Sequence, residues 1–359
     1  MLMIALSCLI LAAVISISDL GANTLYHVRL TQLTDYYDPE MTGERPGEFV
    51  GRGAELLGLH GVVTRDSFKA LMNGIHPESK AKLVKNAGSK SRAAAWDICH
   101  SPDKSFSILW ALAEPAERLE LEAAFCAAVE SSILRIEKAT SIRTGREGIP
   151  TPASPVISRF VHTSAREPYD PQLHAHLVVH NVGVADDGRT GAIVSKPLYQ
   201  QKMMLGALFR CDLAYELGRQ FPRMEFRQTE AGFEIVGVPE HVRAHFSSRR
   251  QQMADELGEL GSESASAKAF AALATRSAKE SVPPLTTLER RWRADADRLG
   301  FTQLHVHETL HRSSRFAHKQ DGVLEKSFGA SLDKLSAKHS HFGQFDITRM
   351  VADAAVAKG

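Results

Sequence analysis

The sequence predicts a mixed α/β (α+β) fold built around a central antiparallel sheet, and two patterns in the chain indicate it. Residues 115–139 repeat apolar side chains at helical spacing, including Leu119 and Ile133, as in a helix that packs one face on a sheet. Residues 155–162 and 171–179 both have the composition of strands, and a short polar connection containing proline joins them. An antiparallel hairpin is therefore expected at the centre of the sheet.

Local signals predict the other elements in chain order. Residues 144–155 form a connection rich in glycine and proline, and a turn at Asp186–Gly188 follows the second strand of the hairpin. Ser195 is expected to cap a long helix rich in leucine. The later elements are a hairpin over residues 225–238, helices from Pro239 to about residue 260, and a helical C-terminal appendage.

Composition favours a cytoplasmic globular protein. The chain has 359 residues, enough for one large domain with an ample core, and its net charge of +1 says little about nucleic acid. The four cysteines show no metal-binding or redox spacing, so reduced thiols in a cytoplasm are expected. No membrane span is required, since the apolar residues 1–14 are too few to cross a bilayer.

Three histidines come together in the predicted hairpin. His174 and His176 lie two residues apart in the second strand, so their side chains point to the same face. If the strands pair, His162 joins them, and three neutral imidazoles on a rigid sheet would bind a divalent cation and leave positions open for substrate. In a chain with sixteen histidines, the pair is also explained by an ordinary surface strand. His180 is a further candidate on the same face.

Tyr26, Tyr36 and Tyr37 are half of the six tyrosines in the chain and fall within twelve residues in a polar setting. A phenol is a poor nucleophile at its usual pKa near ~10, and becomes useful where a cation holds the electrophile and neutralises developing charge. Tyrosine and metal together suggest attack on a phosphodiester with a covalent phosphotyrosine product. The alternative is that Tyr36 and Tyr37 simply anchor an amphipathic turn.

A run of basic residues without an acid lies between residues 80 and 92, and such a run can track phosphates or form a solvated loop. The candidate DNA-binding residues are Lys80, Lys82, Lys85, Lys90 and Arg92, together with Arg166 from the connection between the two histidine strands.

Four segments, in this order, resemble the relaxase domain of conjugative relaxases of the relaxase-helicase type, the MobF class. They are the strand-like Ser16–Leu20 with the tyrosines after it, residues 50–59, residues 96–105, and the histidine region at 160–181. The similarity covers most of residues 15–320, which makes it more specific than any single motif.

The resemblance implies a three-histidine metal site on an antiparallel sheet and N-terminal tyrosine nucleophiles. It puts His162, His174 and His176 at the ligand positions and Asp97 at an aspartate that orients one ligand histidine. Without the resemblance, the sequence favours an ordinary aspartate at a strand end or turn for Asp97.

The implied activity is metal-dependent, site- and strand-specific nicking and strand transfer at a plasmid or integrative-element transfer origin. It proceeds through a 5′-phosphotyrosine with Mg²⁺ or Mn²⁺ as the cofactor. The implied partners are single-stranded or hairpin DNA of the origin and relaxosome accessory proteins.

This chain departs from the family pattern near the tyrosines. The family often has two tyrosine pairs, whereas here Tyr26 is single and is separated from Tyr36 by a longer spacing. We expect Tyr26 to make the first cut, Tyr36 to make the second transfer and Tyr37 to substitute for it, with Tyr36 as the alternative first nucleophile. The connection between His162 and His174 is one residue longer than in relatives, and a loop should absorb the difference.

The resemblance also sets the expected domain organisation. Residues 1–14 are expected to be an apolar N-terminal extension from a mis-assigned start, with a signal peptide or membrane anchor as the alternative. Residues 15–260 are expected to be the catalytic domain, 261–320 a helical appendage that completes it, and 321–359 the start of a linker toward a helicase region. No phosphate-loop motif of the Gly-x-x-x-x-Gly-Lys-Ser/Thr type occurs in the chain, so no motor activity is expected.

Two other functions remain open at this point. One is a rolling-circle replication initiator nuclease, which shares the histidine-pair strand and the tyrosine chemistry. The other is a truncated, non-catalytic remnant that binds DNA without cutting it.

Overall fold

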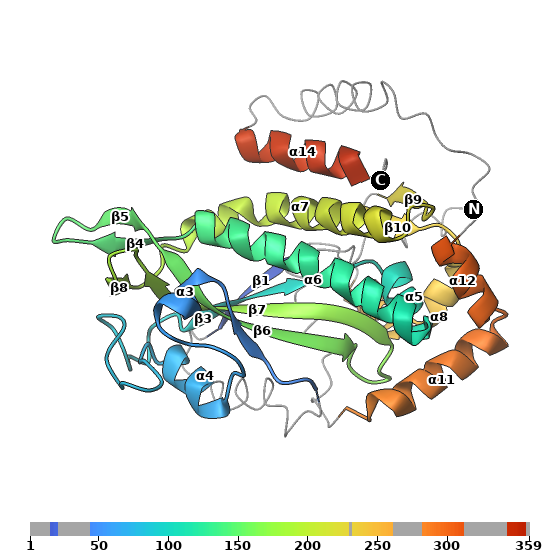
Figure 1. The fold of residues 1–359 in the computed structure, drawn as a ribbon, viewed down its shortest axis with the longest axis horizontal. Helices are drawn as coiled ribbons and strands as arrows, with labels where there is room; N and C mark the ends of the chain where they lie inside the picture. The colour runs from blue at the N-terminus through green and yellow to red at the C-terminus, as the bar shows by residue number, and fades with distance from the viewer. Residues whose placement is uncertain (1–14, 21–43, 230–231, 261–281, 312–342, 357–359) are drawn as a thin grey trace.

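A computed structural model describes residues 15–20, 44–229, 232–260, 282–311 and 343–356. Across these ranges the main sheet has six antiparallel strands in the order β1-β3-β7-β6-β2, with β8 also paired to β7 (Figure 1). The strands are β1 Ser16–Leu20, β2 Glu48–Val50, β3 Ala95–His100, β4 Ser141–Thr144, β5 Ile149–Pro152, β6 Ser154–Ser164, β7 Pro171–Val184, β8 Thr190–Gly191, β9 Phe226–Thr229 and β10 Gly232–Ile235. The helices are α3 Arg52–Leu56, α4 Arg65–Met72, α5 Lys104–Leu112, α6 Pro115–Lys138, α7 Lys196–Gln220, α8 Glu240–His245, α9 Ser248–Leu260, α11 Leu285–Arg298, α12 Gln303–His311 and α14 Gln344–Val356.

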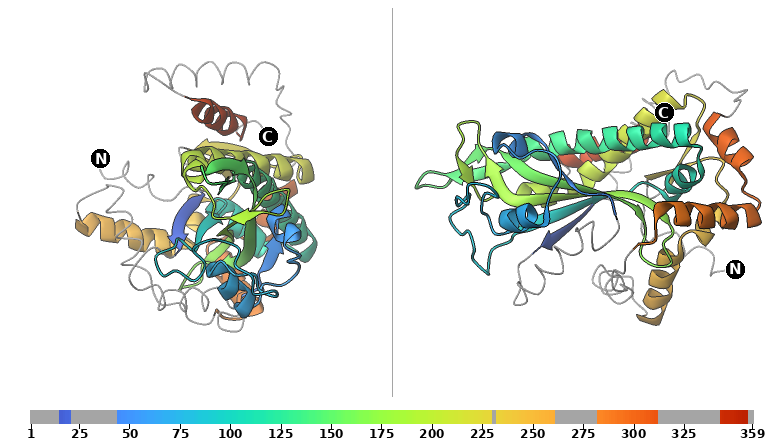
Figure 2. Two further views of the ribbon diagram at one scale, coloured as in Figure 1. Left: turned by 90° about the vertical axis from the view of Figure 1, so that its left-hand side faces the viewer. Right: turned by 60° about the horizontal axis from the view of Figure 1, so that its bottom comes forward.

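The central strand β7 separates two different faces of the sheet. Leu173, Ala175 and Leu177 are buried in the main hydrophobic core, which also contains side chains of α5, α6 and α7. Successive strand residues point to opposite faces, so His174 and His176 lie on the face away from those helices. Figure 2 shows α6 and α7 together on one side of the sheet. The histidines are therefore held by a strand whose other face is anchored in the core.

The predicted hairpin forms, and its register brings the histidines together. β6 and β7 are antiparallel neighbours, with His162 directly opposite His174. Just beyond this pair the register shifts, because the two residues from His162 to Ser164 lie opposite three residues from His174 to Pro171. The hairpin therefore has a β-bulge between the histidines and the loop that joins the strands.

The predicted helix over residues 115–139 is observed as α6, with Pro115 in its first turn. Ile133 is buried on its packed face, as expected, but Leu119 is 67% exposed. The packed face near the start of the helix is set by Leu121 instead, which is completely buried. The spacing predicted the helix correctly but placed its first apolar contact two residues too early.

The C-terminal part of the described chain is helical, as predicted. α14 packs along α7, and Arg210 of α7 forms an ion pair with Asp353 at 2.6 Å (Figure 1). Residues 344–356, which fall within the predicted linker, form a helix that contacts α7. None of the helices in the described ranges is both long and apolar enough to cross a bilayer.

Candidate metal centre

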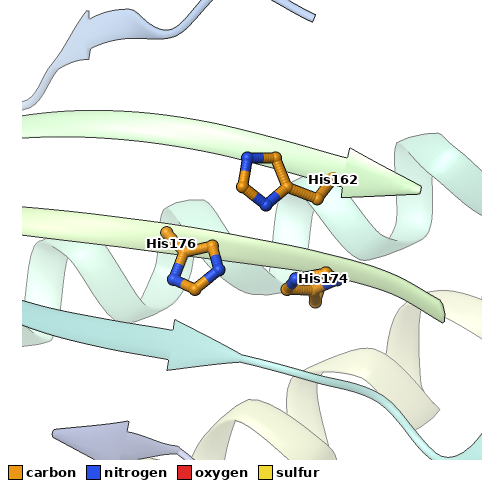
Figure 3. Close-up of side chains that lie close together, drawn as sticks. All are labelled: His162, His174 and His176. Atoms are coloured by element: carbon orange, nitrogen blue, oxygen red, sulfur yellow. The ribbon is translucent and has the colours of Figure 1, made fainter. Parts of the chain in front are cut away.

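The imidazoles of His162, His174 and His176 face one another at one end of the β6–β7 hairpin (Figure 3). Their ring centroids are 5.0 to 5.2 Å apart. Each ring offers a nitrogen, and these three nitrogens lie within 4.8 Å of one another. His162 and His176 are buried, whereas His174 is partly exposed. The arrangement leaves one open side through which a substrate can approach.

Two of the three rings are oriented by hydrogen bonds through Nδ1. The Asp97 carboxylate lies 2.8 and 2.9 Å from His176 Nδ1, and the Gln172 carbonyl oxygen lies 2.8 Å from His174 Nδ1. An acceptor at Nδ1 favours the tautomer with the proton on that nitrogen, which leaves the lone pair of Nε2 free for a cation. The hydrogen bonds thus prepare both rings as neutral ligands.

Asp97 reaches His176 because β3 is the neighbour of β7 on the side opposite β6. In the antiparallel register Asp97 pairs with Val178 and Cys99 pairs with His176, so Asp97 lies diagonally across from the histidine. The Asp97 side chain is only 14% exposed, which limits competition from water for this contact. The predicted hydrogen-bond reach between Asp97 and a histidine of the cluster is confirmed.

The donor set fits a divalent cation. Bonds of about 2.1 Å to nitrogen place neighbouring ligand atoms ~3.4 Å apart in a tetrahedral arrangement. Each pair of nitrogens, which lie within 4.8 Å of one another, would therefore close by no more than ~1.4 Å. Cys99 also faces this site, but burial and the nearby charge of Asp97 raise the pKa of its thiol. Its sulfur is not among the ligand atoms that converge here, which come from His162, His174 and His176. The three histidines are therefore the candidate ligands.

The histidines line a cavity of about 220 Å³ that opens beside the hairpin loop. Two basic residues, Arg166 of the loop and Arg249 of α9, are also in its lining. Tyr169 of the same loop and Glu44, which precedes β2, also line the cavity. The cavity thus combines a candidate cation site with positive side chains, which suits a phosphate-bearing ligand.

A family model described as TrwC relaxase matches residues 20–299. The chain belongs to the TrwC relaxase family. It is 30% identical over 267 residues to the multifunctional conjugation protein TraI of Escherichia coli strain K12, which covers 71% of this chain. The same alignment covers only 14% of TraI, so the chain corresponds to a small part of this much longer relative.

Solved structures of the conjugative relaxase TrwC share the fold. A metal-free TrwC complex with oriT DNA has a TM-score of 0.68 and 26% identity, over 80% of this chain and 99% of that one. A metal-bound TrwC complex with oriT DNA has the same TM-score and identity and is covered to 98%. The match to a TrwC relaxase fold agrees with the expected α/β architecture and its antiparallel sheet.

In this relaxase-family chain, hydrogen bonds join the start of β7 to the first residue of α5 and to the segment that precedes it. Lys104 Nζ donates to the Pro171 carbonyl oxygen at 2.8 Å, and Gln172 Nε2 donates to Ser101 Oγ at 2.6 Å. Burial lowers the pKa of Lys104 to about 8, although nearby Asp170 opposes that effect. These contacts hold the strand where His174 begins the cluster.

The structure places the candidate DNA-binding residues in three different settings. Arg166 lies at the histidine cavity. Lys80, Lys82, Lys85 and Lys90 are exposed in the segment that leads into Ala95, at the end of β3 away from Cys99 and His176. The lysines are therefore not brought to the histidines, and any contact they make with DNA lies farther along the molecule.

Arg92 is buried, which contradicts the prediction that it binds DNA. It is only 2% exposed, and its guanidinium donates to the Asn181 carbonyl oxygen at 3.2 Å. A Cβ on Gly74 would lie 1.9 Å from Arg92 Nη1, and Gly74 has φ +71°, so a glycine is needed where this arginine is buried. Arg92 therefore links the basic segment to β7 in the interior of the protein and does not present its charge to a surface ligand.

His180 is on the same strand face as the cluster but has a structural setting. It is fully buried, lies 2.8 Å from Ser158 Oγ through Nε2, and packs edge-to-face on Phe68 at 5.4 Å between ring centroids. It lies four residues farther along the strand than His176, which corresponds to ~13 Å. The structure therefore does not bring His180 to the cluster.

Two cavity residues were missed at the sequence level. Arg249 and Tyr169 carried no motif. Tyr169 is part of the hairpin loop, whereas only the tertiary structure brings Arg249 of α9 to that loop. That contact includes a hydrogen bond from the Ser248 backbone N–H to Asp170 at 2.8 Å. Tyr26, Tyr36 and Tyr37 lie outside the described residues.

Proposed function

We propose that this chain is a DNA relaxase that nicks one strand at a specific site in a transfer origin and then transfers it, with a divalent cation at His162, His174 and His176. The observation that carries the proposal is the convergence of these three imidazoles, with Asp97 behind one of them, inside a chain of the TrwC relaxase family. Solved TrwC complexes contain oriT DNA, and one contains the recognition hairpin and the cleavage site.

The proposed reaction is a transesterification at phosphorus. A tyrosine Oη attacks the scissile phosphate and loses its proton, the bond from phosphorus to the 3′ oxygen breaks, and the 3′ oxygen takes up a proton as it leaves. The 5′ phosphate stays on tyrosine, and a second strand end reverses the step to rejoin DNA. A cation bound at the cluster supplies charge neutralisation at the phosphate oxygens. Both ester bonds are of similar energy, so no external energy source is required.

The chain's own residues have distinct roles in this proposal. The three histidines hold the cation, and Asp97 fixes the orientation of His176 through its hydrogen bond. Arg166 and Arg249 bind phosphates of the strand that enters the cavity. The exposed lysines at 80, 82, 85 and 90 contact the DNA backbone farther along the same molecule.

We assign the first cut to Tyr26 and the second transfer to Tyr36, with Tyr37 as its substitute and Tyr36 as the alternative first nucleophile. Glu44 lines the histidine cavity and follows Tyr36 by eight residues. A chain spans at most ~3.3 to 3.6 Å per residue, so eight residues reach up to ~28 Å. The covalent connection therefore allows Tyr36 to reach the cluster.

The finer assignments belong to the same proposal. We infer Mg²⁺ or Mn²⁺ as the cation, and a cytoplasmic location, with which the free thiols of Cys99, Cys126 and Cys211 are compatible. The catalytic unit is residues 15–320, with 15–260 as its main part. The partners are single-stranded or hairpin origin DNA and relaxosome accessory proteins.

Membership of the TrwC relaxase family favours this function over a rolling-circle replication initiator. The buried, oriented histidines also argue against a remnant that only binds DNA, since a lost activity would leave no constraint on the contact between Asp97 and His176.

The test is a covalent capture experiment. The purified chain is incubated with an origin oligonucleotide and Mg²⁺ or Mn²⁺, and the tyrosine–DNA adduct is mapped by mass spectrometry. We expect the adduct on Tyr26, and its loss in Tyr26→Phe. An adduct on Tyr36 or Tyr37 would change the order of the nucleophiles but keep the reaction. An adduct on Tyr169, which lines the cavity, would make Tyr169 the nucleophile in place of the N-terminal tyrosines. No adduct on any origin substrate would support the DNA-binding remnant.

A further inference from the structure

A second group of metal-ligating side chains lies where α12 meets the beginning of α6. Glu117 is in the first turn of α6, and His307 and His311 are four residues apart in α12, so both histidines project from one face of that helix. The carboxylate oxygen and the two ring nitrogens lie within 4.8 Å of one another. Segments almost 200 residues apart in sequence thus converge on a single point.

Both imidazoles contact the same oxygen of Glu117. His307 Nδ1 is 2.9 Å and His311 Nε2 is 3.0 Å from Glu117 Oε1, and the two rings are 4.6 Å apart. The other oxygen, Oε2, accepts the Glu114 backbone N–H at 3.2 Å as part of the helix capping box. One carboxylate oxygen is therefore fixed by the helix, while the other faces two histidines.

We propose that Glu117, His307 and His311 bind a zinc-class cation, with the remaining coordination position open to solvent. Two imidazole nitrogens and one carboxylate oxygen are a donor set that Zn²⁺ takes in proteins. The sequence from His307 to His311 is His-Glu-Thr-Leu-His, and this spacing on a helix is the one with which metalloproteases hold zinc.

The geometry needs little adjustment for a cation. Bonds of ~2.0 to 2.2 Å in a tetrahedral arrangement separate neighbouring ligand atoms by ~3.4 Å. The two nitrogen–oxygen contacts would open by ~0.5 Å, and a metal would take the place of the hydrogens that join them now. Glu117 is only 11% exposed, whereas His307 and His311 are 62% and 43% exposed. The site therefore has one buried ligand and two that can rotate.

Cation binding here would fasten the helices that support the histidine cavity. α11 precedes α12, and Trp292 Nε1 donates to the Tyr169 carbonyl oxygen at 2.8 Å. Arg291 of the same helix contacts that oxygen at 3.1 Å, and Glu289 forms an ion pair with Arg118 near the start of α6. A metal that joins α12 to α6 would stabilise this packing, independently of whether the chain cleaves DNA.

The experiment measures zinc bound by the full chain in a background without the first cluster. In His162→Ala/His174→Ala protein, freed of metal with a chelator, equilibrium dialysis should find one equivalent of Zn²⁺. Adding His307→Ala/His311→Ala should abolish that equivalent, and adding Glu117→Gln should weaken it by at least about tenfold, because a ligand is lost and not merely a supporting contact. The matched control is His60→Ala, an exposed histidine in neither cluster, which should leave binding unchanged.

Two further measurements keep the result decisive. Co²⁺ absorption should report nitrogen and oxygen ligation, and Zn²⁺ should raise Tm in the His162→Ala/His174→Ala background but not after His307 and His311 are also replaced. If the background variant fails to fold, the wild-type chain should bind two equivalents and fall to one in His311→Gln. No bound zinc in the folded background variant, or zinc that persists without His307 and His311, would overturn the proposal.

Discussion

The two histidine clusters of this molecule are built in different ways. The sheet cluster places His162, His174 and His176 on paired strands, and the ring nitrogens that carry supporting hydrogen bonds are not those aimed at the site. In the helix cluster, His307 and His311 contact directly the carboxylate that would share the cation with them.

The two clusters also differ in how far their histidines are exposed to solvent. His162 and His176 are buried, whereas His307 and His311 are largely exposed. A cluster that is oriented before a cation arrives suits chemistry on a substrate, because the ligands need not reorganise during the reaction. In the helix cluster, the histidines would give up their hydrogen bonds to the carboxylate when they bind a metal. Such a cluster suits a structural role in which the cation joins two helices.

The largest effect is expected from His174→Ala. Removing one of three ligands should lower metal-dependent nicking by more than ~100-fold, since loss of a mere supporting contact already costs about 10–100-fold. Binding of an origin oligonucleotide should stay largely intact, because phosphate contacts come from other residues. His311→Ala is the matched change in the helix cluster and should leave nicking within about twofold. Equal losses in the two variants would show that the clusters do not differ in function.

Asp97→Asn should lower metal affinity or nicking rate by about 10–100-fold. The amide keeps the size of the side chain but removes the negative charge that faces His176 Nδ1. Metal titration followed by nicking assays at saturating Mn²⁺ separates loss of affinity from loss of rate. Wild-type values in both assays would mean that Asp97 has only a structural role in β3.

His180 tests how a histidine behaves on the same strand face without a cation site. Burial, assisted by the positive charge of Arg92, lowers the pKa of His180 to about 3. The unfolded chain binds a proton near pH 6.5 and the folded chain does not, so stability falls as the pH drops below about 6.5. Between pH 7.5 and pH 5 this one group should cost about 2 kcal/mol.

The measurement is urea denaturation of the wild type and His180→Gln at both pH values. The variant should lose about 2 kcal/mol of the pH dependence, whatever its stability at pH 7.5. The control variant His60→Gln changes an exposed histidine and should keep the full dependence. An unchanged dependence in His180→Gln would show that His180 takes up its proton in the folded chain.

The smallest effect is expected from single phosphate-binding residues. Arg166→Ala should weaken binding of origin DNA and reduce the slope of log affinity against log salt by about one, as expected for one lost phosphate contact. Lys85 precedes the end of β3 that lies away from the histidines. Lys85→Ala should therefore weaken DNA binding less than Arg166→Ala, if the tightest contacts lie near the histidines. A larger effect at Lys85 would move the main DNA contact away from the cavity.

The sheet cluster could be predicted from the sequence because its ligands belong to one hairpin. Strand periodicity sets which side chains share a face, and a short connection favours antiparallel pairing, so His162, His174 and His176 followed from local pattern. Asp97 came only with the family resemblance, since a neighbouring strand distant in sequence supplies it.

The residues that were missed depend on contacts between distant segments. Arg249 reaches the cavity only because α9 folds back on the hairpin loop, whereas Tyr169 is part of that loop and carried no motif. The spacing of His307 and His311 on a helix is visible in the sequence. The third member of their cluster, Glu117, lies 190 residues earlier than His307, and only the fold brings it to them. The prediction for Arg92 was wrong because a run of basic residues does not reveal which of them is buried. Here Gly74, which has no side chain, leaves room for the Arg92 guanidinium in the interior.

The β-bulge next to the histidines bears on how this domain tolerates change. It lies between the pair His162–His174 and the loop at 165–170, so an inserted or deleted residue in the loop is taken up before it reaches the cluster. Without such a device, a slip of one residue would turn His174 and His176 toward the helices. The loop is thus free to diverge in length among relatives, or to be exchanged in the laboratory for a different substrate-contacting segment, while the cation site keeps its register.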